Sequence, residues 1–208
     1  MKVIRKIRKI LKNTIAIAII TTLIHIPANA EELETTYIPT IGIVYIGDSR
    51  TVGLNNVIGM SNLPDTYVIA KVGKGYNWYV KTGSTELQQI KAEHPHNNWI
   101  YIFNLGVNDL GNLEKYKVLI DNLEAEATVY TVSVNPTVDS KTRVKCSSIE
   151  TFNSGLASVA DNYIDTYSYL KANGFTANDG LHYNKDTYQV IYMLIWQYIR
   201  ENSAKAEQ

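Results

Sequence analysis

A repeated alternation of short apolar runs and helix-like segments most constrains the fold of this chain. The apolar runs are rich in β-branched residues, as in strands buried on both faces of a sheet. They lie at 41–46, 67–72, 99–105, 128–134 and, more weakly, 163–167. Segments with helical periodicity follow them at 51–58, 80–93, 113–124, 148–162 and 184–201. The pattern predicts βαβ units, hence a three-layer α/β/α sandwich with a five-stranded parallel sheet of flavodoxin-like order.

The first thirty residues have the layout of a secretory signal peptide. A basic segment precedes a mostly apolar stretch at 15–26, and Ala28-Asn29-Ala30 offers a small-x-small cleavage site. The alternative is an uncleaved anchor helix, but a spanning helix needs about 20 apolar residues and this run is shorter. We therefore expect a signal peptide at 1–30, a lead-in segment at 31–39, and a domain at 40–208. The mature protein is expected to be secreted or associated with the cell wall, without stable membrane insertion.

Charge and cysteine content narrow the partners of the mature chain. Removing the six basic residues of the signal leaves 14 basic and 20 acidic residues, a formal net charge of −6. Nucleic acid and anionic membranes favour a basic face, so neither is expected as a general partner. Cys146 is the only cysteine, so no intrachain disulfide can form and stability must come from the core. A buried, inert thiol is a better expectation for Cys146 than a nucleophile. The sequence leaves the oligomeric state open.

Four short motifs mark the positions where chemistry is expected. They are Gly47-Asp48-Ser49, Gly73-Lys74-Gly75, Gly106-Val107-Asn108-Asp109 and Asp179-Gly180-Leu181-His182. The first three directly follow predicted strands, and the fourth stands just before the last predicted helix. Open α/β sheets bind their ligands at the carboxyl ends of the strands, so the four motifs are expected to meet there.

The first and last motifs together can supply a nucleophile and its base. Ser49 follows a strand and opens a helix, whose N-terminus favours developing negative charge. Asp179 stands three residues before His182, so it can accept the Nδ1 hydrogen while Nε2 faces Ser49. Taken alone, Asp48-Ser49 is equally a helix N-cap pair, and Asp-Gly-x-His is more often a turn. The joint order of the motifs favours a catalytic triad.

The second and third motifs can supply donors to an oxyanion. The Asn108 carboxamide ends the third strand, where it could point into the same crevice. Gly73 and Gly75 could each expose a backbone N–H without obstruction by a Cβ atom, or simply form a tight loop. Asn-Asp could likewise end the strand as a turn.

With these motifs the chain resembles the SGNH hydrolase family, also called the GDSL esterase/lipase family. The resemblance spans Gly47 to His182, with the second block falling on Gly75 and Gly73 as the runner-up. It implies Ser49 as nucleophile, His182 as base and Asp179 as the residue that orients the base. The implied oxyanion hole consists of the Ser49 and Gly75 N–H groups and the Asn108 side chain. Arg50 departs from the Leu of the GDSL name, and the second block lacks the commoner Ser-Gly pair.

The resemblance implies an ester hydrolase that works through an acyl-enzyme without a metal or cofactor. O-acetyl groups on a carbohydrate or cell-wall glycan are the leading substrate class. Secretion, the absence of a lid-sized insertion and Tyr76, Trp78 and Tyr79 beside the second motif favour it. These rings could stack on a sugar or pack on the neighbouring helix.

Several alternatives remain open. They are an acyltransferase with the same triad, a lipid or aryl esterase of lysophospholipase type, and a non-catalytic glycan-binding module. The intact set of Ser49, Asn108, Asp179 and His182 disfavours the last. His94-Pro95-His96 could bind a metal, but a solvated loop is the better expectation because no ligand cluster accompanies it.

Overall fold

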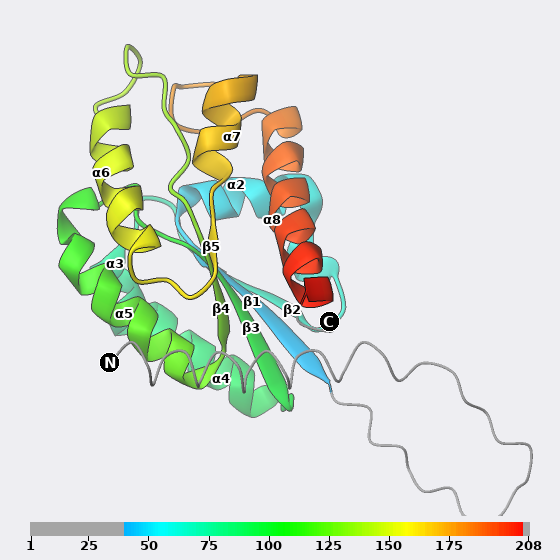
Figure 1. Cartoon of the computed structure of the whole chain (residues 1–208). Coiled ribbons are helices and arrows are strands. Elements are labelled where there is room, and N and C mark those ends of the chain that lie inside the picture. Colours follow the sequence, from blue (N-terminus) through cyan, green and yellow to red (C-terminus); the bar gives the residue numbers. More distant parts are fainter. Residues whose placement is uncertain (1–39, 206–208) are drawn as a thin grey trace, which may run out of the picture.

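The computed structural model describes residues 40–205, so the predicted signal peptide and lead-in lie outside the described residues. Five parallel strands form one sheet in the order β2-β1-β3-β4-β5 (Figure 1). The strands are β1 (Ile41–Gly47), β2 (Thr66–Ala70), β3 (Asn98–Asn104), β4 (Thr128–Val132) and β5 (Tyr163–Ile164). This is the flavodoxin-like order that the sequence predicted.

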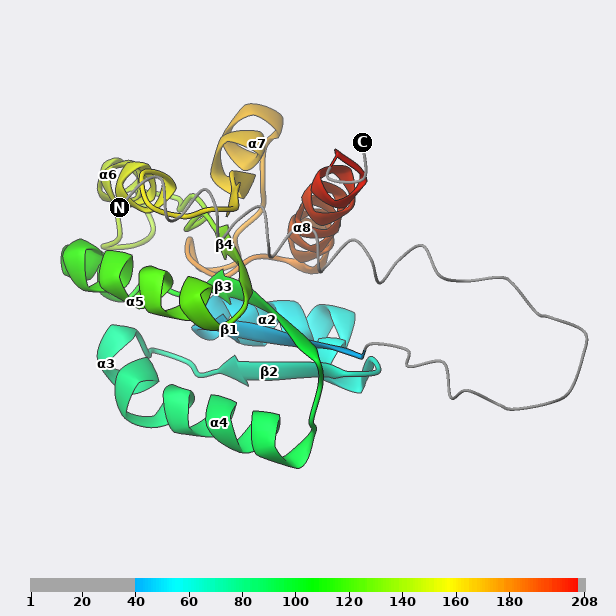
Figure 2. The same ribbon diagram turned by 60° about the horizontal axis from the view of Figure 1, so that its bottom comes forward.

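Helices cover both faces of the sheet, as Figure 2 shows for α4 and α5 on one side and α8 on the other. The first layer contains α4 (Ser84–Glu93), α5 (Leu113–Glu126) and α6 (Cys146–Ala157). The second contains α2 (Ser49–Ile58), α7 (Thr166–Asn173) and α8 (Lys185–Lys205). Shorter elements are the helix α3 (Tyr76–Trp78), the π-helical turn η2 (Tyr79–Gly83) and the 3₁₀ turns η1 (Met60–Asn62) and η3 (Leu110–Asn112).

The central strands explain why the sheet has a helix layer on each face. Successive side chains of a strand point to opposite faces. In β1, Val44 and Ile46 belong to the core beneath α4–α6, whereas Tyr45 belongs to the core beneath α2 and α8. In β3, Phe103 belongs to the core beneath α4–α6 and Ile102 to the core beneath α2 and α8. Both faces are therefore apolar, which is why these strands read as continuous apolar runs.

The last helix presents an apolar stripe to the sheet. Its buried residues Tyr188, Ile191, Ile195 and Ile199 recur every three or four positions, the spacing of one face of an α-helix. Tyr188 of α8 is therefore a packing residue. Within residues 40–205, no helix combines the length and apolar character needed to cross a membrane.

Several predicted elements differ in their bounds from the structure; the helix predicted at 148–162, for example, ends at Ala157. The fifth strand ends at Ile164 instead of 167, because Asp165 accepts a hydrogen bond from the Ser168 N–H at 3.0 Å and caps α7. The helix predicted at 80–93 begins earlier, as α3, and passes through the π-helical turn η2 before α4. The buried Tyr79 lies in this turn and packs on Phe103, so it belongs to the core.

Candidate active site

The nucleophile candidate lies where strand β1, between β2 and β3 in the sheet, meets helix α2. β1 ends at Gly47, Asp48 is the N-cap of α2 and Ser49 is its first residue. The Asp48 carboxylate accepts the Arg50 N–H at 3.0 Å, so the cap that the sequence suggested is present. Ser49 is 6% exposed and sits at the carboxyl edge of the sheet, at the positive end of the helix dipole.

His182 contacts Ser49 from the loop that precedes α8. An isolated antiparallel bridge joins Ala177 to Tyr183, and the Asn178 N–H donates to the His182 carbonyl at 2.7 Å. These contacts fold residues 177–183 into a tight hairpin just before α8. The hairpin brings its tip to a residue 133 positions earlier in the chain.

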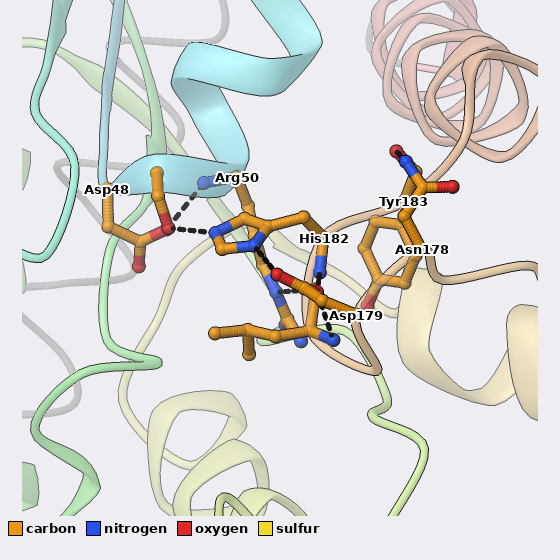
Figure 3. Close-up of polar contacts among 8 residues, drawn as sticks. Asp48, Arg50, Asn178, Asp179, His182 and Tyr183 are labelled. Carbon is orange, nitrogen blue, oxygen red and sulfur yellow. Dashed lines mark hydrogen bonds and ion pairs between the residues drawn. The ribbon is translucent and has the colours of Figure 1, made fainter. Parts of the chain in front are cut away.

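The three triad candidates are joined in one line of hydrogen bonds (Figure 3). His182 Nε2 lies 2.8 Å from Ser49 Oγ, and His182 Nδ1 lies 2.7 Å from Asp179 Oδ2. A carboxylate can only accept, so Nδ1 carries the hydrogen and Nε2 is left to accept the Ser49 hydroxyl proton. This is the tautomer that a general base for a serine nucleophile requires.

Asp179 also holds the hairpin that presents the histidine. Its Oδ1 accepts the Leu181 and His182 N–H groups at 2.9 and 2.7 Å. Burial alone would raise the pKa of Asp179, but the hydrogen bonds from the His182 side chain and from these N–H groups outweigh it. The pKa of Asp179 is therefore well below its usual range. Asp179 thus makes both the main-chain contacts of a turn and the side-chain contact to His182 that the triad interpretation requires.

Asp48 links the first motif to the third, a role that the sequence did not reveal. Besides capping α2, its carboxylate accepts the Val107 N–H at 3.3 Å. Burial raises the pKa of Asp48, while the donated hydrogen bonds and the Arg50 charge oppose that rise. Asp48 is 2% exposed and joins the loop after β3, which carries Asn108, to the helix that carries Ser49.

Asp109 performs a similar function between the third and second motifs. It accepts hydrogen bonds from the Tyr76 N–H at 2.8 Å, the Asn112 amide at 3.2 Å and the Tyr116 hydroxyl at 2.6 Å. A Cβ atom at Gly75 would lie 2.4 Å from Asp109 Oδ2, so any larger residue there would have to displace the hydrogen-bonded Asp109 carboxylate. The motif signalled Asp109, but its partner Tyr76, 33 residues upstream, could not be inferred from spacing.

The second and third motifs lie together, and the bond from Val107 to Asp48 joins the third motif to the start of α2. Asn108 is exposed and its Nδ2 donates to the Lys74 carbonyl at 2.8 Å. A carboxamide nitrogen carries two hydrogens, so this bond leaves one for a further acceptor. Gly75 is the N-cap of α3, and Gly73 is exposed with a positive φ of 68°. The second and third motifs therefore meet, as predicted.

A hollow of about 440 Å³ adjoins these donors. Its lining residues are Gly73, Lys74, Gly75, Asn77, Trp78, Lys81, Thr82, Asn108 and Asp109. Trp78 is the aromatic residue of the sequence prediction that lines it. Tyr76 instead packs edge-on against Tyr116, with ring centroids 5.6 Å apart, and Lys115 lies over its ring. Tyr76 therefore packs on the neighbouring helix and does not line the hollow.

The remaining sequence candidates lie elsewhere. Cys146 is buried and its Sγ lies 3.3 Å from the Thr137 carbonyl, as expected for an inert thiol. The solvated loop expected at His94-Pro95-His96 is wrong for His96, whose side chain is 7% exposed and packs against Trp99. Its Nε2 lies 3.3 Å from the Tyr67 hydroxyl. Among the described residues, no group of three or more His, Cys, Asp or Glu side chains is placed to hold a metal ion.

Comparison with known proteins places the fold. No protein-family model and no curated protein sequence matches the chain. Among solved structures, a lipase/acylhydrolase from Enterococcus faecalis aligns with a TM-score of 0.55 at 18% identity, over 80% of this chain and 97% of that one. The catalytic domain of peptidoglycan O-acetyltransferase A from Streptococcus pneumoniae gives 0.55 at 18% identity, over 81% and 96%.

A third similar structure is a catalytic mutant of an acetylxylan esterase from Geobacillus stearothermophilus. It aligns with a TM-score of 0.54 at 11% identity, over 76% of this chain and 93% of that one. The likeness in all three cases covers nearly the whole of the known domain. The chain therefore has the fold of the SGNH hydrolases, which its four motifs predicted.

Proposed function

We propose that the protein is a serine esterase that works through an acyl-enzyme. The single observation that carries this proposal is the continuous contact from Ser49 Oγ through the His182 ring to Asp179. A serine hydroxyl is a weak nucleophile unless an oriented base removes its proton. The contacts of His182 provide that base in the required tautomer. The fold shared with esterases and acylhydrolases supports the same reaction class.

The reaction follows from these positions. His182 takes the hydroxyl proton as Ser49 Oγ bonds to the ester carbonyl carbon, and the carbonyl oxygen becomes an oxyanion. The Ser49 and Gly75 N–H groups and the second Asn108 N–H donate to that oxygen. The protonated His182 then donates to the leaving alcohol, which departs and leaves an acyl-Ser49 ester. Water, deprotonated by His182, releases the acid and restores Ser49. Asp179 stabilises the imidazolium in both halves.

We further propose an O-acetylated glycan as the substrate, either a cell-wall polymer or another extracellular carbohydrate. The hollow beside Gly75 and Asn108 is lined by amide, hydroxyl and ammonium groups and by the indole of Trp78. Such a mixture suits a sugar, whose hydroxyl groups need hydrogen-bond partners and whose ring face can contact an aromatic side chain. Two similar structures are named for acetylated xylan and for peptidoglycan acetylation. The signal peptide expected at 1–30 would deliver the enzyme to such polymers.

An acyltransferase is the second candidate, favoured by the likeness to the peptidoglycan O-acetyltransferase domain. It would use the same acyl-Ser49 intermediate, but a sugar hydroxyl would replace water in the second half. Only the fate of the acyl group separates the two activities.

One assay distinguishes these functions. The mature protein is incubated with p-nitrophenyl esters of increasing chain length, with acetylated xylan and with O-acetylated peptidoglycan, and released acetate is measured. The proposal predicts acetate release from at least one glycan, a preference for short acyl chains and no release by Ser49→Ala. Acetyl transfer to an added glycan, without net acetate release, would identify the transferase. A preference for long acyl chains would overturn the glycan proposal and favour a lipid esterase.

A further inference from the structure

Arg50 is a buried cation at an unfavourable position. It follows the nucleophile candidate in the first turn of α2 and is 3% exposed. A positive charge at a helix N-terminus opposes the helix dipole, and burying a charge costs free energy unless its hydrogens are satisfied. The GDSL motif name carries a leucine at this position, so helix formation alone does not require an arginine there.

All three guanidinium nitrogens of Arg50 are occupied by main-chain carbonyl groups. Nε donates to the Leu181 carbonyl at 3.1 Å, and the two terminal nitrogens donate to the carbonyls of Asn135 at 2.7 Å and Pro136 at 3.3 Å. The guanidinium also lies over the Tyr183 ring, 5.1 Å from its centroid. Arg50 therefore contacts the residues on both sides of His182.

The two loops that Arg50 contacts are already joined to each other. The Tyr183 hydroxyl donates to the Pro136 carbonyl at 2.5 Å, and the Val138 N–H donates to the Gly180 carbonyl at 2.9 Å. The loop after β4 and the hairpin at 177–183 thus form one unit. Arg50 attaches that unit to the first turn of α2, one residue from Ser49.

We propose that Arg50 is a positioning residue that sets the distance between the nucleophile and the base. Ser49 and Arg50 are adjacent on one element, and Leu181 and His182 are adjacent on the other. A guanidinium bound to Leu181 therefore fixes His182 Nε2 relative to Ser49 Oγ through two short covalent connections. A displacement of about 1 Å in a reacting group can lower the rate by about 10²-fold. This inference rests on the proposed function.

The rest of the fold should survive without the guanidinium. α2 packs on α8 through the apolar core that contains Leu54 and Ile191. The hairpin keeps its own contacts between Asp179 and His182. Arg50→Lys retains the charge but has a single ammonium group in place of a planar fork, so it cannot hold both loops in the same geometry. The expected defect is therefore one of placement.

The test compares Arg50→Lys and Arg50→Gln with two controls. Arg143→Lys changes an exposed arginine, and Leu123→Ala destabilises the buried face of α5 on the other side of the sheet. Each protein is assayed at a temperature where thermal melts show it fully folded. For both Arg50 variants kcat should fall about 10–100-fold with KM nearly unchanged, and the phosphonylation rate of Ser49 should fall in parallel. Both controls should keep the wild-type kcat.

A crystal structure of Arg50→Lys supplies a measurement that does not depend on activity. The proposal predicts that the Ser49 Oγ to His182 Nε2 distance exceeds about 3.2 Å, the usual limit of such a hydrogen bond. A distance unchanged from wild type, or a folded variant with wild-type kcat and only a lower Tm, would overturn the positioning role. A wild-type protein with no esterase activity would instead contradict the proposed function, while the distance would still test the role of Arg50.

Discussion

The triad half and the oxyanion half of the site differ in how fully the protein's own contacts define them. On the triad half, Ser49, His182 and Asp179 already make hydrogen bonds of 2.7–2.8 Å to one another. On the oxyanion half, Asn108 is exposed and donates to the Lys74 carbonyl, beside an open hollow. In the proposed mechanism the contact between Ser49 and its base is therefore present before substrate arrives. The proposed oxyanion donors gain their remaining acceptor from the carbonyl oxygen of the substrate.

In both halves, a carboxylate from one motif accepts a main-chain N–H group from another motif or from the residue that follows it. Asp48 binds the third motif, and Asp109 binds the residue that follows the second. The two carboxylates differ in burial: Asp48 is buried on the triad half, whereas Asp109 lines the hollow. The following predictions test whether the two halves contribute separately to catalysis.

Removal of the nucleophile should have the largest effect. Ser49→Ala should lower kcat by about 10⁶, since removal of a triad serine leaves only oxyanion stabilisation and binding. The fold should persist because Asp48, which caps α2, is unchanged. Steady-state hydrolysis of p-nitrophenyl acetate measures this effect. Retention of substantial turnover by the folded variant would show that the triad half is not the site of attack.

Removal of the negative charge of Asp179 should rank second. In Asp179→Asn the amide oxygen can still accept from Leu181 and His182, but its nitrogen cannot accept the Nδ1 hydrogen. The histidine then holds the wrong tautomer, and kcat should fall by about 10⁴. Unchanged kinetics would mean that Asp179 serves only the turn.

The same variant has a predicted pH signature in stability. Because the folded-state pKa of Asp179 is lowered, its ionised form stabilises the protein above the ordinary aspartate pKa of about 3.9. That contribution is lost as the pH falls through the lower folded-state value. The difference in Tm between wild type and Asp179→Asn should be constant above about pH 5 and shrink below about pH 4. Melts from pH 3 to pH 8 measure it, with His94→Gln as an exposed control.

Removal of the oxyanion carboxamide should have a smaller effect, and it should change kcat more than KM. Asn108→Ala should reduce kcat by about 10²–10³, because the lost hydrogen bond strengthens only as the oxyanion forms. A binding module would instead show weaker ligand affinity. The two constants, measured on one good ester, separate these cases, and a rise in KM alone would assign Asn108 to ground-state binding.

The two glycines of the second motif form a matched pair with the smallest expected effects. A Cβ at Gly75 would collide with Asp109, so Gly75→Ala should displace the loop and lower kcat by about 10²-fold. At Gly73 a Cβ would meet nothing within 4 Å, but the positive φ should cost about 1–2 kcal/mol of stability. Thermal melts and kcat for both variants test this. A larger loss of kcat in Gly73→Ala than in Gly75→Ala would show that the position of the loop at Gly73 matters more to catalysis.

The sheet and the positions of the motifs could be predicted because burial on both faces leaves a direct mark on the sequence. Runs such as that of β1 admit few polar residues, and motifs that follow such runs must gather at one edge. The start of α7 was missed because one cap, Asp165, redirects the chain after only two paired residues. The partners of Arg50 lie 85, 86 and 131 positions away, a distance over which spacing carries no information.

Covalent labelling of the nucleophile tests the proposed mechanism most directly. The mature protein is treated with a serine-reactive organophosphonate, digested and analysed by peptide mass spectrometry, beside Ser49→Ala and Asn108→Ala. The mechanism predicts one added phosphonyl group, located on the peptide that contains Ser49, slower labelling of Asn108→Ala and none of Ser49→Ala. Labelling at another residue, or an active esterase in which Ser49 stays unmodified, would contradict the assignment of Ser49 as the nucleophile.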